Sequence, residues 1–230
     1  MPGAAIVDQF WADLTFVHWP VDSDRVVHLF PPGTRPDVFA DGMTYVALVP
    51  FTMRHTAFGT GPAIPYFGRF AETNVRLYSV DDAGHHGVVF RSLEAARLAV
   101  VPMGRLALGV PYTWAKMRIT RSGDHLTYAS VRRWPHPGLR SRLTVKIGDS
   151  LEPTPLETWL TARWGAHTRK AGSTWWMPNQ HGPWPLQAAE IVELNDDLVA
   201  AAGISFSREP LRALYSPGVH ARFGRPERLP

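Results

Sequence analysis

The chain has 230 residues, of which 45% are hydrophobic and 19% charged, a balance typical of one soluble globular domain or at most two. It contains no cysteine, which excludes disulfides, thiolate zinc sites and a cysteine nucleophile. The net charge is +4 at pH 7, but the basic residues are scattered rather than gathered in a run, so we expect no nucleic-acid partner.

The first half of the chain is predicted to form short strands separated by turns, with one short helix. Its glycines and prolines, part of 19 and 21 in the whole chain, favour many short segments over long helices. Ser23 or Asp24 can cap a helix that ends at Phe30. We expect strands at 12–17, 37–39, 43–50, 70–78 and 88–91, with an Asp41-Gly42 hairpin turn between the second and the third.

The clearest helix is predicted to begin at Ser92, next to the middle of the chain. Ser92 is a suitable N-cap, and Ala95, Leu98 and Ala99 follow it at helical spacing. Pro102 is expected to break or kink this helix, because a proline inside a helix removes a backbone hydrogen bond.

The second half is predicted to continue as strands with two more short helices. Thr154 precedes a helix that has Pro155 at its favoured first position and ends at Arg163. A second helix is expected at 196–202, closed by a glycine. The predicted strands lie at 115–121, 126–134, 140–147, 175–176 and 186–193.

About ten strands and three or four short helices predict an α+β fold with a large, mostly antiparallel, curved sheet or barrel. We expect a single domain at residues 1–221 and a loose C-terminal tail at 222–230. No stretch approaches the ~20 apolar residues of a spanning helix, and no basic segment followed by an apolar run marks a signal peptide. A cytoplasmic protein with no membrane partner is therefore expected.

The predicted strand at 70–78 carries a polar face, formed by Glu72, Asn74, Arg76 and Tyr78. In an antiparallel sheet one face is usually wet, and these residues would then be an ordinary solvated surface. If the sheet closes on itself, the same face lines an interior. A buried Glu72 would then need a paired or hydrogen-bonded neighbour, and Asn74 and Arg76 are suitable partners.

Lys116 is a second candidate, because the chain has only three lysines. A lysine attacks a carbonyl as the neutral amine, so imine chemistry requires a pocket that lowers the lysine pKa by roughly 3–4 pH units. Arg118 would share the face of Lys116 and favour such a shift. The apolar face of this strand holds Ala115, Met117 and Ile119, however, which favours a solvated Lys116.

The ten histidines do not fall at the helical spacing of a metal site, so we expect neither a metal nor another cofactor.

Several segments, taken in order, resemble the YqjF-like family of bacterial proteins of unknown function. The match spans almost the whole chain. Its segments are 11–22, 49–53, 70–78, 90–95, 111–117, 181–187 and 215–219.

This family is in turn similar, more distantly, to acetoacetate decarboxylase, which implies a closed, cone-like β-barrel with an internal cavity. In the decarboxylase a Gly-x-Pro turn is followed directly by the Schiff-base lysine. Here Tyr112 and Thr113 follow the turn 109–111, and Lys116 lies about 10 Å farther along the strand than Thr113. The resemblance therefore implies the decarboxylase fold, with Glu72, Asn74 and Arg76 facing the interior, but not decarboxylation through an imine.

Two functional hypotheses follow. The first is a protein that binds a small carboxylate or carbonyl metabolite in the barrel, with Arg76 as the anion partner and Tyr112 as a hydrogen-bonding group. Asn74, Tyr78 and Trp114 would complete the ligand site. A small molecule is the expected partner, and the sequence leaves a homo-oligomer open.

The second hypothesis is an enzyme of small carbonyl or carboxylate chemistry without a Schiff base. Glu72 would be the general acid or base, with its pKa raised by burial. Arg76 would hold a carboxylate or enolate oxygen, and Tyr112 would donate to the same oxygen. A subordinate version uses Lys116 to form an imine.

Overall fold

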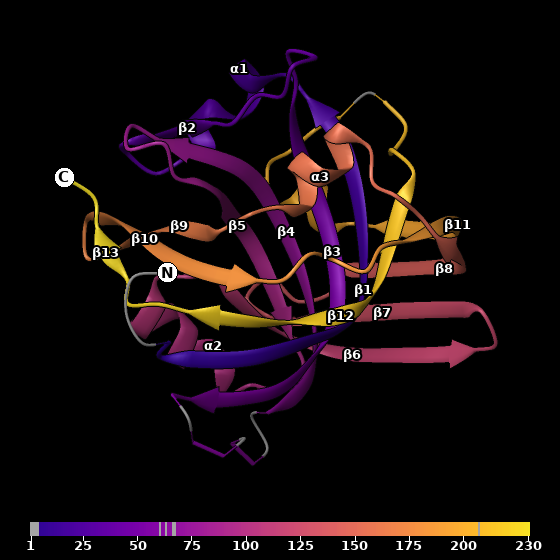
Figure 1. Ribbon diagram of the computed structural model, residues 1–230. Helices are drawn as coiled ribbons and strands as arrows, with labels where there is room; N and C mark the ends of the chain where they lie inside the picture. The colour runs from indigo at the N-terminus through magenta and orange to yellow at the C-terminus, as the bar shows by residue number, and fades with distance from the viewer. Residues whose placement is uncertain (1–4, 60, 63, 66–67, 207) are drawn as a thin grey trace.

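One continuous sheet organises the chain in the computed structural model, which describes residues 5–59, 61–62, 64–65, 68–206 and 208–230 (Figure 1). Thirteen strands of the described residues belong to it. They are β1 (Val7–Val21), β2 (Thr34–Pro36), β3 (Thr44–Phe58), β4 (Arg69–Asp81), β5 (His86–Ala95), β6 (Tyr112–Ser122), β7 (His125–Trp134), β8 (Arg140–Ser150), β9 (Gly165–Lys170), β10 (Ser173–His181), β11 (Gln187–Asp196), β12 (Ala213–Phe223) and β13 (Glu227–Arg228).

The helices of the described residues are short and lie between strands. They are α1 (Ser23–Val26), the 3₁₀ turn η1 (Val27–Leu29), α2 (Val100–Met103), the π-helical turn η2 (Gly104–Leu108), α3 (Pro155–Thr161) and α4 (Leu198–Ala201). None of them is long and apolar enough to cross a bilayer.

The strand pairing closes the sheet on itself, which makes it ring-like. The order is β13-β10-β9-β5-β6-β7-β8-β11-β12-β1-β3-β4-β2, and two further pairings, β4 with β5 and β10 with β12, join strands that are distant in that order. Two rings result. The first ring runs through β5, β9, β10, β12, β1, β3 and β4, and the second ring runs from β5 through β6, β7, β8 and β11 to the same β12, β1, β3 and β4.

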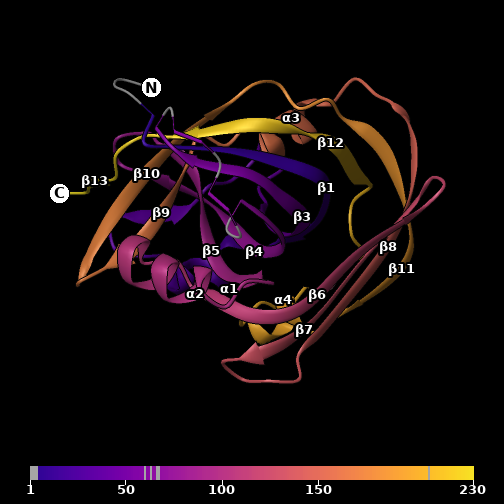
Figure 2. The same ribbon diagram turned by 90° about the horizontal axis from the view of Figure 1, so that it is seen from below.

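The strands β1, β3 and β4 form a shared layer between the two rings. Figure 2 shows β9 and β10 on one side of this layer, and β6, β7, β8 and β11 on the other. Because successive side chains of a strand point to opposite faces, each strand of the layer supplies both sides. Along β3, Ala47 and Val49 pack in one apolar core, while Val46 and Leu48 pack in the other.

The two cores define the two interiors. The first core includes Phe16, Phe51, Tyr78, Leu160 and Met177, and the second core includes Trp19, Leu77, Leu126, Val145 and Leu198. A fully buried aliphatic or aromatic side chain contributes roughly 1.5–3 kcal/mol relative to exposure. Strands covered on both faces therefore contribute more per residue than strands with one wet face.

The helix expected to begin at Ser92 is wrong. Residues Ser92–Ala95 are the end of β5, where they pair with β4 on one side and with β6 on the other. All four are buried, so tertiary pairing overrides a helical pattern of small residues. The helix begins later, at Val100, and Pro102 lies within its first turn, where its missing N–H costs nothing.

Most other expected elements are present with changed bounds. The expected helices at 23–30, 155–163 and 196–202 correspond to α1 with η1, to α3 and to α4. The strand expected at 37–39 is instead β2 at Thr34–Pro36, which pairs with β4 rather than with β3. The strand β9 was not predicted.

The C-terminal residues do not form the loose tail expected at 222–230. The strand β12 continues to Phe223, and β13 pairs with β10 through Trp175–Arg228 and Trp176–Glu227. The backbone N–H of Leu229 also donates to the carbonyl of Thr174 at 2.9 Å.

Candidate functional site

The polar face of β4 is buried. Its strand lies between β3 and β5 and forms part of the layer shared by the two rings. Glu72 is 2% exposed and Asn74 is 6% exposed, Tyr78 is fully buried, and Arg76 is half-buried. Tyr78 belongs to the first core, so this face looks into the first ring rather than into solvent.

Glu72 lies in an apolar setting with neutral hydrogen-bond partners. The hydroxyl of Tyr112 donates to its Oε2 at 3.0 Å. No Arg, Lys or His of the described residues lies within 4.0 Å of its carboxylate. Burial raises the pKa of Glu72 to about 8, although hydrogen bonds from Tyr112 and Asn74 lower it in part. Glu72 is therefore mostly protonated at neutral pH and can both donate and accept a proton.

Tyr112 reaches Glu72 because the turn before β6 is tightly packed. Gly109 has a φ of 67°, a left-handed conformation that favours glycine. Gly104 lies directly against the Tyr112 ring, and a Cβ at Gly104 would overlap it. The turn 109–111 thus places a phenol beside the buried carboxyl group.

Asn74 adds an unused acceptor beside Glu72. Its Oδ1 is buried and has no hydrogen-bond partner. A buried amide oxygen without a partner is costly, so a donor on a bound molecule would be favourable here.

Arg76 does not pair with Glu72. Four residues along a strand span about 13 Å, and the Arg76 guanidinium turns toward the aromatic rings of the first core instead. Its Cζ lies 5.7 Å from the centre of the Phe16 ring and 5.8 Å from that of Tyr78. Within the described residues no carboxylate lies within 4.0 Å of Arg76, and its Nε is buried without a hydrogen-bond partner.

A second guanidinium, that of Arg163, also lies near the Tyr78 ring. Arg163 is paired with Asp37, and its Cζ lies 4.8 Å from the Tyr78 ring and 3.9 Å from the Trp159 ring. Among the described residues, one carboxylate therefore balances the two guanidinium groups beside Tyr78.

His18 connects this group of residues to a cavity. Its Nε2 lies 2.7 Å from the Tyr78 hydroxyl oxygen, and the Tyr78 hydroxyl donates to the carbonyl of Leu160 at 3.0 Å. The Tyr78 hydroxyl has one proton, and the bond to Leu160 uses it. The Tyr78 oxygen must therefore accept from His18 Nε2, which leaves His18 Nδ1 as an acceptor. Burial lowers the His18 pKa well below its usual value, and the charges of Arg76 and Arg163 lower it further.

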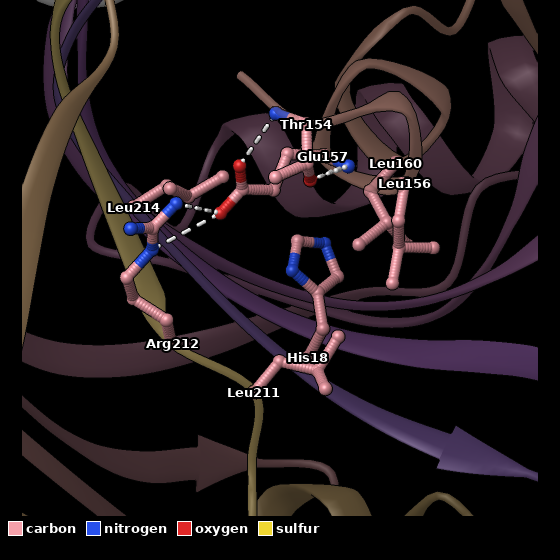
Figure 3. A pocket seen from close by; sticks show the side chains of 8 residues that line it. All are labelled: His18, Thr154, Leu156, Glu157, Leu160, Leu211, Arg212 and Leu214. Atoms are coloured by element: carbon pink, nitrogen blue, oxygen red, sulfur yellow. Dashed lines mark hydrogen bonds and ion pairs between the residues drawn. The ribbon is translucent and has the colours of Figure 1, made fainter. Parts of the chain in front are cut away.

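The cavity has a volume of about 180 Å³ and lies beside His18 (Figure 3). The imidazole stands between leucine side chains and an ion pair, in which Arg212 Nη2 lies 2.6 Å from Glu157 Oε1. Its lining residues are His18, Thr154, Leu156, Glu157, Leu160, Leu211, Arg212 and Leu214. The Arg212 side chain is 52% exposed, so the ion pair marks the outer end of the cavity.

The ion pair depends on how α3 begins. Thr154 Oγ1 accepts from the N–H of Glu157 at 3.2 Å, and Glu157 Oε2 accepts from the N–H of Thr154 at 2.8 Å. This capping box holds the Glu157 carboxylate beside Arg212. Burial alone would raise the Glu157 pKa, but the hydrogen bonds from Thr154 and Arg212 outweigh it and lower the pKa.

The structure brings together only part of the predicted set. Glu72, Asn74 and Tyr112 form one group, and Arg76 and Tyr78 form another on the same face. Neither Glu72 nor Arg76 lines the cavity beside His18.

Two predicted residues lie elsewhere. Lys116 is exposed on β6, where its amine keeps its hydration. Trp114 is half-buried under the guanidinium of Arg133, whose Cζ lies 5.5 Å from the ring centre.

Sequence reasoning missed three contributors. His18 occurs in an apolar stretch, and a polar residue at a core position was the one available signal. Arg163 and the Glu157–Arg212 pair become recognisable only once α3 packs on the first ring. Within the described ranges, no group of three or more His, Asp or Glu is arranged to hold a metal ion.

The sequence matches a known family. Residues 8–220 match the family DUF2071, described as an uncharacterized conserved protein. The chain is 30% identical over 208 residues to the uncharacterized protein YqjF of Bacillus subtilis (strain 168), an alignment that covers 88% of this chain and 84% of that protein.

Solved structures share the fold at low sequence identity. An acetoacetate decarboxylase-like enzyme from Sphingomonas wittichii RW1 superposes with a TM-score of 0.68 at 16% identity, over 99% of this chain and 94% of that one. Acetoacetate decarboxylase from Legionella pneumophila gives a TM-score of 0.67 at 13% identity, over 100% and 92%. The enduracididine biosynthesis enzyme MppR complexed with pyruvate gives 0.66 at 11%, over 100% and 92%.

Proposed function

Since this chain belongs to the DUF2071 family and has the fold of acetoacetate decarboxylase-like proteins, we propose that it binds a small carboxylate or carbonyl compound without forming an imine. The first ring would act as a closed barrel, with the ligand inside it. The polar face of β4 and His18 would supply the ligand's hydrogen bonds and charge.

The unmatched charge of Arg76 is the observation that carries this proposal. A half-buried guanidinium loses part of its hydration, and a nearby carboxylate normally compensates for that loss. Arg76 has no such partner among the described residues, while the adjacent Arg163 is already matched by Asp37. A carboxylate on the ligand would restore the balance.

The size of the cavity supports a small ligand. An engineered apolar cavity of about 150 Å³ holds benzene, so a cavity of about 180 Å³ suits a compound of roughly six non-hydrogen atoms. The acceptor Nδ1 of His18 and the leucine wall suit a short chain with a hydrogen-bond donor at one end. Arg76 does not line this cavity, but its guanidinium lies near Tyr78, the hydrogen-bond partner of His18.

The positions of the lysines argue against an imine. The three lysines of the chain, Lys116, Lys146 and Lys170, are all exposed. A Schiff-base lysine must be desolvated to be neutral near pH 7. The position after the Gly-x-Pro turn is taken by Tyr112.

Glu72 supports a second candidate, an enzyme of small carbonyl or carboxylate chemistry. A carboxyl group with a pKa of about 8 is suited to proton transfer near neutral pH. The unpartnered Oδ1 of Asn74 lies beside it and would accept a hydrogen bond from the hydroxyl of an enol. Arg76, about 13 Å along the strand from Glu72, would hold the carboxylate of a substrate long enough to reach both residues.

The test is a calorimetric titration with carboxylates of two to six carbons, including acetoacetate and pyruvate. A hydrogen bond to a charged group contributes about 1.5–3 kcal/mol, so Arg76→Gln should weaken binding roughly 10- to 150-fold. Arg118→Gln, which removes the same charge from an exposed site on β6, should leave binding unchanged. Equal affinity in wild type and Arg76→Gln would refute the proposal.

The same titration separates the two candidates when it is combined with product analysis. If the protein only binds its ligand, Glu72→Gln alters affinity and no product forms with either protein. If it is an enzyme, the wild type converts the bound compound, and Glu72→Gln binds it without conversion.

A further inference from the structure

A second cavity lies along the edge of β5, between the points where β5 pairs with β9 and with β6. On one side of β5, β9 pairs at Val88 and β6 pairs only from Leu93 onward. The residues between these points have no strand beside them on that side. A cavity of about 320 Å³, the β5 cavity, lies there between η1, β9 and the turn 109–111.

The β5 cavity is cationic. Arg91 and Arg169 line it, and none of its lining residues is acidic. In the described part of the chain, neither Arg91 nor Arg169 lies within 4.0 Å of a carboxylate. The buried carboxylate of Asp81 lies behind the cavity wall, where His85 and His167 already bind it.

Arg91 is held in place but not neutralised. Its Nη1 donates to the carbonyl of Leu29 at 3.2 Å, and its Nη2 to that of Ala202 at 3.5 Å. Its Nε is buried and has no hydrogen-bond partner. Arginine stays charged in proteins, so a positive charge fixed by neutral carbonyls is available to an anion.

The rest of the wall is mainly apolar, with His28, His167 and Thr168 as its further polar members. Phe30, Phe90 and Pro111 line the β5 cavity together with Leu29 and Val89. A volume of about 320 Å³ lies at the lower end of the range for small-molecule sites, roughly 300–1,000 Å³, and such sites combine apolar walls with a few polar groups. The occupant should therefore carry an anionic group on an apolar body.

We propose that the β5 cavity is a second binding site, for a small organic oxyanion in which a phosphate or carboxylate is attached to an apolar, ring-sized group. Arg91 and Arg169 would bind the oxyanion, and Phe30 and Phe90 would pack on the apolar group. This site is separate from the polar face of β4, because neither Glu72 nor Arg76 lines it.

The experiment uses three probes of one shape: phenyl phosphate, benzoate and the uncharged benzyl alcohol. Each is titrated against the full chain, and amide chemical shifts or heats are measured. We expect the wild type to bind at least one anion and not benzyl alcohol. Whichever of phenyl phosphate and benzoate binds more tightly shows whether the site prefers a phosphate or a carboxylate.

Variants of the two arginines locate the binding. Arg91→Gln should weaken the better anion about tenfold or more. Arg169 is exposed, so Arg169→Gln should weaken it about threefold while leaving the fold intact. Arg118→Gln is the control and should bind the anion as the wild type does.

Three results would overturn the proposal: no binding of either anion by the wild type at millimolar concentration, equal binding of benzyl alcohol, or unchanged affinity in Arg169→Gln. Because Arg76→Gln affects the polar face of β4 alone, a loss of anion binding in that variant would assign the anion to the first ring. The two proposals can thus fail independently.

Discussion

On the same strand face, a carboxyl group and a guanidinium meet opposite environments. Burial keeps Glu72 protonated. Among the described residues, Glu72 has no cation beside it and Arg76 has no anion beside it. Strand geometry separates them by about 13 Å, too far for an ion pair. Each residue therefore lacks a charged partner, which a bound molecule can supply.

Glu72 should make the stability of the protein depend on pH. Its pKa is about 8 when folded and near 4.5 when unfolded, so between these values the folded state holds a proton that the unfolded state has released. The free energy of unfolding then falls as pH rises through this window, by roughly 4–5 kcal/mol in all. Glu72→Gln removes this contribution while keeping the shape of the side chain.

The measurement is urea denaturation of both proteins at pH 5, 6, 7, 8 and 9. All other titrating groups are shared, so the difference between the two proteins isolates Glu72. We expect the variant to gain stability over the wild type from pH 5 to pH 8 and no further above that. Parallel pH profiles would show that Glu72 ionises in the folded state as freely as in the unfolded chain.

At the scale of elements, α3 is a short helix with a large positional role. It has seven residues, and its Leu160 carbonyl accepts from Tyr78 while its Glu157 pairs with Arg212. A helix this short has little stability of its own. Its capping box and its packing on the first core therefore determine where these groups lie.

Thr154→Ala should lower stability by about 1 kcal/mol, because an N-cap hydroxyl typically contributes 0.5–2 kcal/mol. For a chain of this size, that corresponds to a decrease in Tm of roughly 2–4 °C. Thr158→Ala, an exposed substitution on the same helix, is the matched control and should leave Tm almost unchanged. If both variants melt alike, the capping box does not stabilise α3.

At the scale of the whole molecule, the shared layer of β1, β3 and β4 separates two interiors. One interior receives the polar face of β4, and the other receives Val75 and Leu77. With all three lysines on the outside, neither interior contains an amine that can form an imine. The interior of the first ring holds the carboxyl group of Glu72 and the phenols of Tyr78 and Tyr112 instead.

Borohydride reduction tests this distribution of lysines. Treatment with borohydride in the presence of acetoacetate or pyruvate should add no mass to any lysine beyond the level of the acid-denatured protein. An exposed lysine stays hydrated, so desolvation does not favour its neutral, reactive amine. Stoichiometric addition at one lysine in the native protein alone would contradict the proposed function.

The fold and the site were predictable to different degrees. Alternation at 70–78 correctly predicts a strand with a polar face. The sequence also shows directly that Tyr112, and not a lysine, follows the Gly-x-Pro turn. The alanine-rich stretch after Ser92 wrongly predicts a helix, because small residues suit both a helix and a tightly paired strand. His18 gives no local signal that it would meet Tyr78, 60 residues away.

By itself, the sequence determined the strand-rich class, the positions of most turns, the two-sided pattern of β4 and the lack of a lysine after the Gly-x-Pro turn. These features depend on backbone preferences and on side-chain periodicity, which act over a few residues. Tertiary structure alone decided that the polar face lies inside the first ring, that Lys116 lies outside, and that Arg91 and Arg169 meet at the β5 cavity. Burial and charge pairing depend on which distant strands become neighbours, and no local pattern specifies that.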